Sequence, residues 1–437
     1  MLSPPSAAGT GCAQALPPTV LPAAIRDLLH ARASAGTVSG YVYDPQVAAD
    51  RARALRAVLP PWASLFFAAK ANGSPAVLAA LAGPGGVDGF EVASRAEADA
   101  ARSALLATGR SPRLLAAGPA KTPALLAALL DGGTEVVHVE SPLELARLSA
   151  VARARGRTVR VGLRVNPAAV GVRGTLAMGG RPAPFGIPEP DVPEVLALAR
   201  SLPGLDVIGF HVHAVCGNRD ARAHAGYVAW CLDWAARTAR EHRVDLRWVD
   251  VGGGLGVAYG GEDPLDLDLL GAELHRLAPP AGVEVALEPG RWLAADCGWY
   301  AAQVVDVKHS YGTAYVLVRG GIGGFALPGT EDFPFPLTVL PVEDWPAGLP
   351  RPGLRDGPVT VAGELCTPED VLVRDVVVDR VRAGDLVVIP QAGAYGWEFA
   401  LQSFLGHPPA TRDVVAVPAT DARPAPPALV PALGVAP

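Results

Sequence analysis

The chain has 437 residues, half of them hydrophobic, so it is long enough for more than one domain and for a large buried core. Its formal net charge is −6 at pH 7 without any block of like charge, so we expect no nucleic-acid partner. The five cysteines form no Cys-x-x-Cys pair, which argues against a disulfide framework and a structural zinc site. Neither a signal peptide nor a long apolar run is evident, so we expect a cytoplasmic protein with no membrane partner.

The predicted elements favour a barrel followed by a β domain. Residues 1–36 are expected to form an N-terminal segment that is partly disordered. From 37 to 290, short apolar strands alternate with Ala- and Leu-rich helices, which predicts an α/β fold with a (β/α)8 barrel. An open doubly wound sheet is the alternative. Residues 291–418 carry Val-rich runs between Gly and Pro, typical of a β domain into which the strand 38–43 is a candidate to pair. The Pro- and Ala-rich tail, 419–437, is expected to be disordered.

Functional groups of a barrel gather at the carboxyl ends of its strands, so the residues after each expected strand are the candidate site. The first expected strand starts near Leu65 and runs into Lys70. The other seven strands are expected at Gly89–Val92, Leu114–Ala117, Glu135–Val139, Val159–Val165, Val207–Val212, Trp248–Val251 and Val283–Leu287.

Lys70 follows five apolar residues and is one of only three lysines in a chain whose other cations are arginines. Burial at a strand end disfavours the ammonium group and lowers the pKa of a lysine. A lysine with a lowered pKa attacks carbonyl groups and forms a Schiff base, which an arginine cannot do. The alternative is a lysine that extends from the strand end to solvent.

Two later strand ends carry groups that suit a phosphorylated cofactor. Gly252-Gly253-Gly254 follows a strand, and consecutive glycines let backbone N–H groups approach a phosphate closely. The spacing does not match a dinucleotide fingerprint, and a plain tight turn is the alternative. At the last barrel strand, Glu288 suits a protonated ring nitrogen and Arg291 suits a phosphate. An ordinary ion pair around the intervening Pro-Gly turn would give the same pattern.

Other candidates are less specific. His211 and His213 share one face of a strand end, but a zinc site would lack a third ligand. A histidine stacked on an aromatic cofactor, or a core histidine, is the better interpretation. In the β domain, Cys366 alone is most often a small hydrophobe, and Tyr395 alone is an aromatic residue of a turn.

Taken together and in this order, the motifs resemble those of the fold-type III pyridoxal-phosphate decarboxylases, which include the diaminopimelate and ornithine decarboxylases. The resemblance covers about residues 20–415 and rests on Phe67–Asn72, Gly252–Gly254, Glu288–Arg291, Cys366-x-x-x-Asp370 and Gly393–Tyr395. A narrower resemblance is to the siderophore-biosynthesis decarboxylases of staphyloferrin B and achromobactin type, which act on an amino acid already joined to citrate or a related acid. It rests on Cys297–Tyr300, Val318–Gly321, Leu365–Leu372, Ala392–Trp397 and Phe404–Pro408.

The resemblance implies a homodimeric decarboxylase with shared active sites, pyridoxal 5′-phosphate as cofactor, and a small substrate derived from an amino acid. Lys70 would hold the cofactor as a Schiff base, His211 would stack on its pyridine ring, and Cys366 of the partner subunit would protonate the substrate α-carbon. Glu288 would keep the ring nitrogen protonated, which favours decarboxylation over racemisation. The remaining cofactor ligands would be Gly253, Gly254, Gly290, Arg291 and Tyr395 at the phosphate, and Glu91 and Arg164 at the hydroxyl side of the ring.

Three positions depart from the family pattern. Thr367 follows Cys366, where amino-acid decarboxylases commonly have an acidic residue that binds a distal ammonium group. Ala214 replaces a common phosphate-side serine, and the turn after Arg319 is rich in bare glycines. We therefore expect a conjugate whose carboxylate meets Arg319 or His213, with Asp370 as a further substrate contact and no metal. The alternatives are a decarboxylase of free diaminopimelate, ornithine or lysine, an amino-acid racemase, and a non-catalytic pyridoxal-phosphate carrier, against which the long C-terminal part argues.

Overall fold

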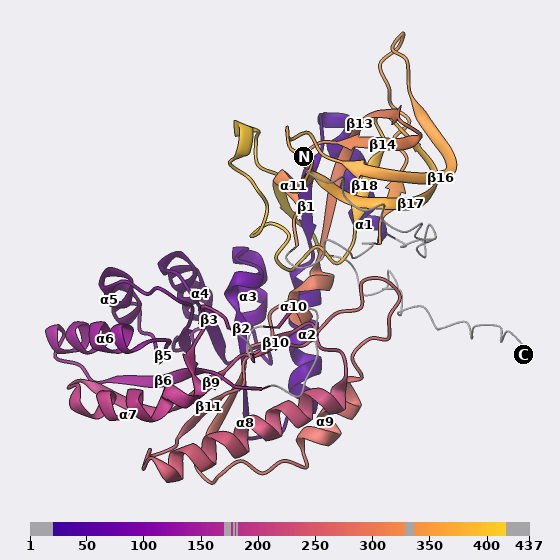
Figure 1. The fold of residues 1–437 in the computed structure, drawn as a ribbon. Coiled ribbons are helices and arrows are strands. Elements are labelled where there is room, and N and C mark those ends of the chain that lie inside the picture. Colours follow the sequence, from indigo (N-terminus) through magenta and orange to yellow (C-terminus); the bar gives the residue numbers. More distant parts are fainter. Residues whose placement is uncertain (1–20, 170–175, 178–179, 181, 328–335, 417–437) are drawn as a thin grey trace, which may run out of the picture.

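The computed structural model has two parts, a barrel and a β domain that lies against one end of it (Figure 1). It describes residues 21–169, 176–177, 180, 182–327 and 336–416. The predicted N-terminal segment is therefore described only from residue 21, and the predicted tail lies outside the described residues.

Eight parallel strands form a closed barrel. β2 (Ala63–Ala68) pairs with β3 on one side and β12 on the other, and β5 pairs with β6, so the ring of strands is complete. This closure confirms the predicted barrel and excludes the open doubly wound sheet. The remaining barrel strands are β3 (Gly89–Val92), β4 (Leu114–Ala116), β5 (Val136–Val139), β6 (Val159–Asn166), β9 (Leu205–Val212), β11 (Trp248–Asp250) and β12 (Glu284–Leu287), with the short β8 (Ile187–Pro188) beside β6.

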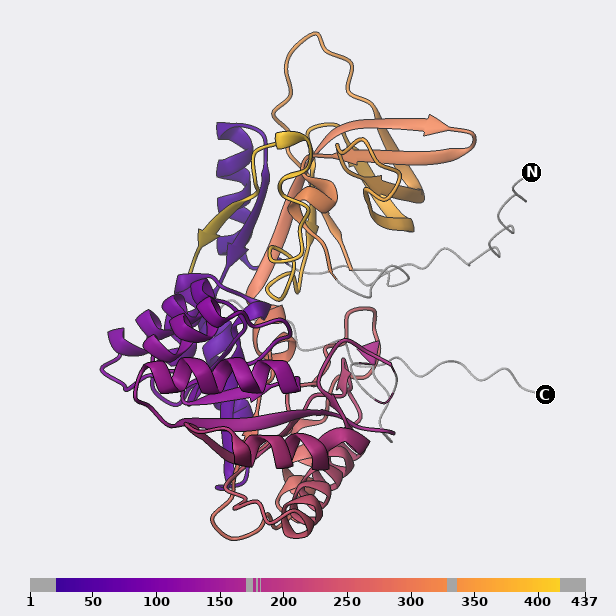
Figure 2. The same cartoon turned by 60° about the vertical axis from the view of Figure 1, so that its left-hand side comes forward.

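Helices surround the barrel (Figure 2). α2 (Pro45–Val58) precedes the first barrel strand and contacts both α3 and α9, which completes the outer ring. Ser94, Ser141 and Asp220 cap three of these helices, because each side chain accepts the N–H of the third residue after it. The other ring helices are α3 (Pro75–Ala82), α4 (Arg95–Ala107), α5 (Pro123–Asp131), α6 (Pro142–Ala154), α7 (Val192–Ser201), α8 (Ala221–Glu241) and α9 (Leu267–Leu274).

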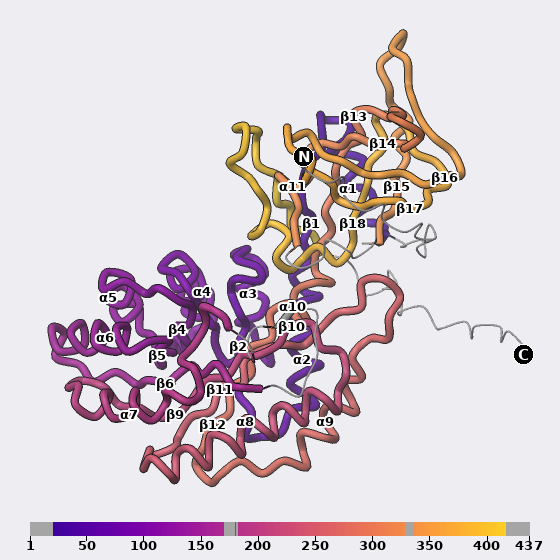
Figure 3. The backbone as a smooth tube through the Cα atoms, in the orientation of Figure 1, coloured from indigo at the N-terminus to yellow at the C-terminus, as the bar shows by residue number. Residues whose placement is uncertain are grey.

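The β domain combines both ends of the described chain. β1 (Ser39–Tyr43) pairs antiparallel with β13 and parallel with β19, so the indigo and yellow ends of the tube run side by side in Figure 3. β1 lies within the range assigned to the barrel, 37–290, but belongs to the β-domain sheet. The expected pairing of strand 38–43 is thus confirmed. The other β-domain strands are β13 (Gly298–Ser310), β14 (Thr313–Val318), β15 (Thr338–Leu340), β16 (Gly353–Ala362), β17 (Val371–Arg382), β18 (Leu386–Ile389) and β19 (Thr411–Val414).

Shorter elements connect these parts. α1 (Ala23–Ala35) packs on the β-domain sheet through Ile25 and Leu29. α10 (Arg291–Ala294) links the last barrel strand to β13, and α11 (Gly321–Gly324) follows β14. Two very short strands, β7 (Leu176–Ala177) and β10 (Val215–Cys216), pair with each other in antiparallel fashion. No helix in the described ranges is long and apolar enough to cross a membrane.

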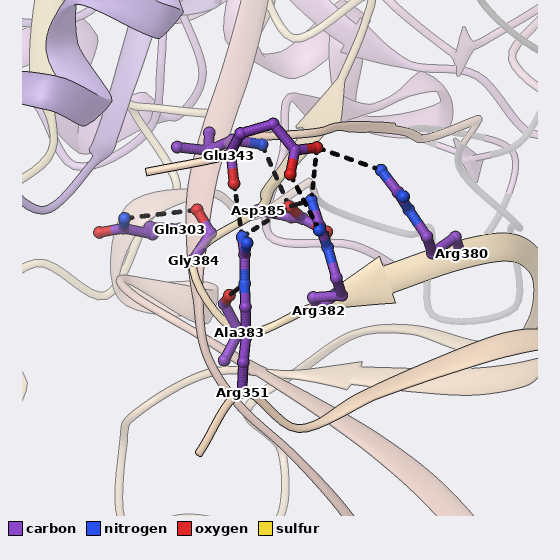
Figure 4. A network of polar contacts seen from close by, with 9 residues as sticks. Gln303, Glu343, Arg351, Arg380, Arg382, Ala383, Gly384 and Asp385 are labelled. Carbon is purple, nitrogen blue, oxygen red and sulfur yellow. Dashed lines mark hydrogen bonds and ion pairs between the residues drawn. The ribbon is translucent and has the colours of Figure 1, made fainter. Parts of the chain in front are cut away.

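A buried carboxylate organises one edge of the β domain (Figure 4). Asp385 lies between β17 and β18 and is fully buried. Its Oδ1 accepts from the Val342 N–H at 3.1 Å and from Arg351 Nη2 at 3.2 Å, and its Oδ2 accepts from the Arg382 N–H at 2.8 Å. Glu343, at the surface, pairs with Arg382 from the other side. Asp385 therefore neutralises two arginines and satisfies two backbone donors at once.

Candidate active site

The end of β2 is tied to the β domain. Lys70 lies in a short 3-10 turn, Ala69–Ala71, directly after the strand. Asn72 Nδ2 donates to the Gly393 carbonyl at 2.7 Å, and the Tyr395 N–H donates to the Ala71 carbonyl at 2.7 Å. The lysine predicted at a strand end thus lies at the junction of the two parts of the chain.

Lys70 pairs with a buried carboxylate of the neighbouring strand. Its Nζ donates to Glu91 Oε2 at 2.5 Å, and its side chain stays 44% exposed, while Glu91 is buried. Desolvation opposes the charged form of Lys70, but Glu91 and Glu288 outweigh it and raise the lysine pKa above its ordinary value. The predicted lowering of the pKa is therefore wrong, because two carboxylates act on Lys70 together with burial.

Glu288, which follows β12, and His211, on β9, face each other from the two strands that flank β11 in the barrel. Their Oε2 and Nε2 atoms are 3.6 Å apart, and both side chains are buried. Glu288 Oε1 and both His211 nitrogens lack a hydrogen-bond partner within the described structure. Burial lowers the pKa of His211 well below its ordinary value, and burial together with Asp250 and Glu91 raises that of Glu288. At neutral pH the imidazole is uncharged.

Two further buried side chains lie beside Glu288 and His211, and the sequence prediction missed both: His138 on β5 and Asp250 on β11. The ring centroids of His138 and His211 are 4.2 Å apart, and His138 Nε2 lies 3.5 Å from Asp250 Oδ2. Within the described residues, these two and His211 and Glu288 form a group whose ligand atoms all lie within 4.8 Å of one another, close enough to hold a metal ion. In the sequence His138 looks like a core position of Val-Val-His-Val, and only barrel closure brings it to His211.

The glycine turn after β11 contacts the end of β9. Gly254 has a φ of +94°, and a Cβ there would lie 2.8 Å from the Val215 carbonyl oxygen, so only glycine fits. The Gly253 N–H donates to His213 Nδ1 at 3.1 Å. His213 Nε2 in turn lies 3.3 Å from Cys216 Sγ. His213 is therefore engaged with the predicted phosphate turn.

Arg291 is a buried cation whose contacts in the described chain are with aromatic residues. It is 9% exposed, and within the described chain it forms no ion pair with a carboxylate. Its Nη1 donates to Tyr259 Oη at 3.2 Å, and its Cζ lies 4.8 Å from the centroid of the Tyr395 ring. A Cβ at Gly290 would lie 3.3 Å from Tyr395 Oη, so the three residues meet closely. An uncompensated buried guanidinium is suited to an anionic ligand.

Arg164, by contrast, is already paired. Its Nη1 donates to Glu140 Oε1 at 2.8 Å, and Glu140 Oε2 accepts from the Gly186 N–H at 3.0 Å. The guanidinium lies over the Phe185 ring at 5.2 Å. Its charge also contributes to the low pKa of His211, so it lies near the group around Glu288.

Comparison with known proteins assigns the fold and the chemistry. Residues 47–295 match the family model described as "Pyridoxal-dependent decarboxylase, pyridoxal binding domain". The chain belongs to the pyridoxal-dependent decarboxylases. It is 32% identical over 381 residues, 86% of this chain and 94% of the relative, to 2-[(L-alanin-3-ylcarbamoyl)methyl]-2-hydroxybutanedioate decarboxylase of Staphylococcus aureus. It is 30% identical over 380 residues, 84% of this chain and 86% of the relative, to L-glutamyl-[BtrI acyl-carrier protein] decarboxylase of Niallia circulans.

Solved structures support the same architecture. Diaminopimelate decarboxylase of Helicobacter pylori, complexed with L-lysine, superposes with a TM-score of 0.73 at 22% identity, over 87% of this chain and 91% of that one. The lysine/ornithine decarboxylase of Vibrio vulnificus gives 0.72 at 21% identity, over 91% and 99%. The predicted barrel with a C-terminal β domain is therefore confirmed.

The side chains around Lys70 fit the cofactor of this decarboxylase family. Lys70 supplies a primary amine. Among the described residues, Glu288 is a buried acid with a partnerless oxygen, and Arg291 is a buried cation without a carboxylate partner. These three groups match the aldehyde, ring nitrogen and phosphate of pyridoxal 5′-phosphate. His211 adds a neutral ring with unpaired nitrogens. The functional groups at this site therefore suit the cofactor that the family model names.

Three predicted residues lie elsewhere, on the β domain of the decarboxylase. Asp370 is buried, and its two oxygens accept the N–H groups of Ile322 and Leu365, both at 2.7 Å. Arg319 forms an ion pair with Glu364, while Cys366 is exposed on the same loop. In the described part of the chain, none of the three bonds to the residues around Lys70. The geometry favours a positioning role for Asp370, which ties the Cys366 loop to α11.

Proposed function

We propose that this decarboxylase removes the α-carboxylate of an amino acid that is already joined to citrate or a similar acid, in siderophore or related specialised metabolism. The observation that carries the proposal is the loop of Cys366. Thr367 follows the cysteine where an acidic residue would bind a free diamino acid, and Arg319 and His407 lie around Glu364 beside it. The printed names of the two relatives above also describe amino acids linked to a larger group.

Residues of the barrel and of the β domain would bind different groups of the cofactor. Lys70 would bind it covalently, His211 would stack on the ring, Glu288 would lie at the ring nitrogen, and Glu91 and Arg164 would lie at the hydroxyl side. The phosphate would be bound by Arg291 and Tyr395 with Gly253, Gly254 and Gly290. Bound pyridoxal phosphate supplies the electron sink for the electrons left when CO2 departs.

Each protein group then has a task that follows from its surroundings. Glu91 accepts from Lys70 Nζ and keeps the amine at the mouth of the barrel. Glu288 holds a proton at the ring nitrogen, and neutral His211 covers the ring without adding charge. Loss of CO2 leaves a carbanion that needs a proton, and a positioned thiol is a suitable acid for it. We assign that proton to Cys366 of the partner subunit.

A homodimer would bring that thiol into place. Cys366 is exposed in the single chain, on a loop held by Asp370. The segment after Trp397 exposes Phe399, Leu401 and Phe404 in succession, an apolar surface that a second copy would cover. We place this dimer in the cytoplasm.

The test of the substrate is CO2 release from a matched panel. The enzyme loaded with pyridoxal phosphate should release CO2 from a citryl-diaminopropionate conjugate and hardly from free ornithine, lysine or diaminopimelate. Arg319→Gln should raise KM for the conjugate with less effect on kcat, because Arg319 is expected to bind its carboxylate. Equal turnover of free diaminopimelate would replace the proposal by the free-diamino-acid alternative, and racemisation without CO2 would replace it by the racemase alternative.

The test of the shared site is a mixture of two inactive variants. Lys70→Ala and Cys366→Ala dimers should each be nearly inactive. After subunit exchange at equal amounts, about a quarter of the wild-type activity should return, since half of the dimers would carry one intact site of two. No recovery, with subunit exchange shown by mass, would contradict a site shared between subunits.

A further inference from the structure

The four buried side chains behind the cofactor site form a connected set. Glu288 faces His211 at 3.6 Å, His211 packs on His138 with centroids 4.2 Å apart, and His138 Nε2 lies 3.5 Å from Asp250 Oδ2. The carboxylate oxygens of Asp250 and Glu288 lie within the same 4.8 Å group. All four residues are at most 4% exposed. The roles proposed above account for only two of them, Glu288 and His211.

Two buried carboxylates this close cannot both be ionised at low cost. Coulomb repulsion is strong at short range in a medium of low dielectric constant, so such a pair retains one proton between its members. The charges that face the pair are Lys70 and Glu91 from the β2 and β3 strand ends, and Arg164 acts on both histidines. Lys70 is already neutralised by Glu91 at 2.5 Å.

We propose that Asp250 and Glu288 share one proton, and that Asp250, with His138, is a positioning residue that makes this proton available to the pyridine nitrogen of the bound cofactor. The inference deepens the proposed function, because it rests on the cofactor ring lying at Glu288. The proton balance is closed: one proton leaves the carboxyl pair and one N–H bond forms on the ring, while the total charge stays the same.

The hydrogen-bonding pattern assigns the proton to Glu288. Asp250 Oδ1 already accepts the Gly252 N–H at 2.8 Å, which stabilises its ionised form. Burial raises the pKa of both carboxyls, but the contact between them raises the pKa of Glu288 and lowers that of Asp250. Glu288 is then the donor and Asp250 the acceptor, and the proton lies on the residue nearer to the proposed ring position.

His138 completes the arrangement from the other side. Its ring fits against β6 because position 162 is a glycine, where a Cβ would lie 2.8 Å from His138 Cδ2. Burial, with Lys121 and Arg164, lowers the pKa of His138 well below its ordinary value, so it is neutral. A neutral imidazole, whose Nε2 lies 3.5 Å from Asp250 Oδ2, occupies the space beside that carboxylate without adding a positive charge that would remove the shared proton.

Infrared spectroscopy tests this directly, since a protonated carboxyl has a carbonyl stretch separate from the carboxylate bands. With 13C-labelled glutamate, protein stripped of cofactor should show a glutamic-acid band that persists above neutral pH. Asp250→Asn keeps the shape of the side chain, and should move the loss of this band to lower pH by about one unit. His138→Gln should shift it in the opposite sense to Asp250→Asn or broaden it, whereas His224→Gln, at another buried histidine outside the group, should leave it unchanged.

Addition of pyridoxal phosphate then tests the transfer. The band that is sensitive to Asp250→Asn should disappear in wild type at neutral pH as the cofactor binds, with loading followed by visible absorbance. Loading without loss of that band would overturn the transfer, and a glutamate that is ionised at neutral pH in the stripped protein would overturn the sharing. If the cofactor fails to bind while the band behaves as described, the cofactor placement fails and the shared proton stands.

Two further measurements test the shared proton without any substitution in the chain. With 13C on aspartate instead of glutamate, the band should not move, because the proton lies on Glu288. A band that moves would place the proton on Asp250 and contradict the assignment. Stoichiometric zinc in the purified protein would also overturn the proposal, since a metal bound by the same four side chains would displace the proton.

Discussion

Replacement of Arg291 should separate recognition of the cofactor phosphate from recognition of its ring. Arg291 is 9% exposed, and in the described part of the chain it has no carboxylate partner. A hydrogen bond from a charged donor contributes about 1.5–3 kcal/mol, so the loss of one such bond corresponds to about 10- to 150-fold weaker binding. Arg291→Gln should weaken pyridoxal 5′-phosphate by this factor, and should leave pyridoxal, which lacks the phosphate, nearly unchanged.

The assay is a titration of the stripped protein with each ligand, followed by visible absorbance. Arg113→Gln is the control, because Arg113 is a half-buried arginine that pairs with Glu135 and Glu284 where the barrel strands begin. The control should lower the free energy of unfolding and leave both affinities alone. If Arg291→Gln weakened both ligands equally, Arg291 would act on the structure of the site and would not be the phosphate ligand.

Three other predictions concern stability and the lysine. Asp385→Ala should cost about 3–5 kcal/mol in chemical unfolding, because it removes the carboxylate partner of Arg351, one of the two carboxylates paired with Arg382, and the acceptor of two backbone N–H groups. Glu343→Ala at the exposed end of the same network should change little. Burial lowers the pKa of His224 from 6.5 to about 4, so the folded protein loses stability as the pH falls from 6.5 toward 4. His224→Leu should remove up to roughly 3 kcal/mol of this pH-dependent change in the free energy of unfolding. An unchanged pH dependence would show that His224 is already charged in the folded protein over this range. Lys70→Arg keeps a cation for Glu91 but cannot form a Schiff base, so CO2 release should vanish with little loss of stability; residual turnover would exclude Lys70 as the covalent site.

The barrel was predictable from the sequence because each strand is a short apolar run with a helix after it. The site was predictable in part because Lys70, Glu288 and Arg291 each follow such a run, where barrel enzymes carry their chemistry. The pairing of strand 38–43 with the β domain was also predicted. Short elements, such as β15, β19 and α10, carry too few residues for a periodic signal.

The site residues that the sequence did not reveal depend on contacts between strands that are far apart in the sequence. His138 and Asp250 gave no local signal of their own, since one lies inside an apolar strand and the other before a glycine turn. Their importance arises from closure of the barrel, which brings β5, β9, β11 and β12 to one point. The pKa of Lys70 was predicted in the wrong direction for the same reason, because burial could be inferred from the sequence but the two carboxylates beside the lysine could not.

Chemical capture of the cofactor on the chain is the most direct test of whether Lys70 binds it covalently. Borohydride reduces a Schiff base to a stable amine, so reduction of the loaded protein, followed by digestion and mass spectrometry, locates the pyridoxyl group. The chain has only Lys70, Lys121 and Lys308 as acceptors, which makes the result unambiguous. We expect the modification on Lys70 alone, and none in Lys70→Arg. Modification of Lys121 or Lys308 in its place, or of no lysine in protein that has turned over substrate, would contradict it.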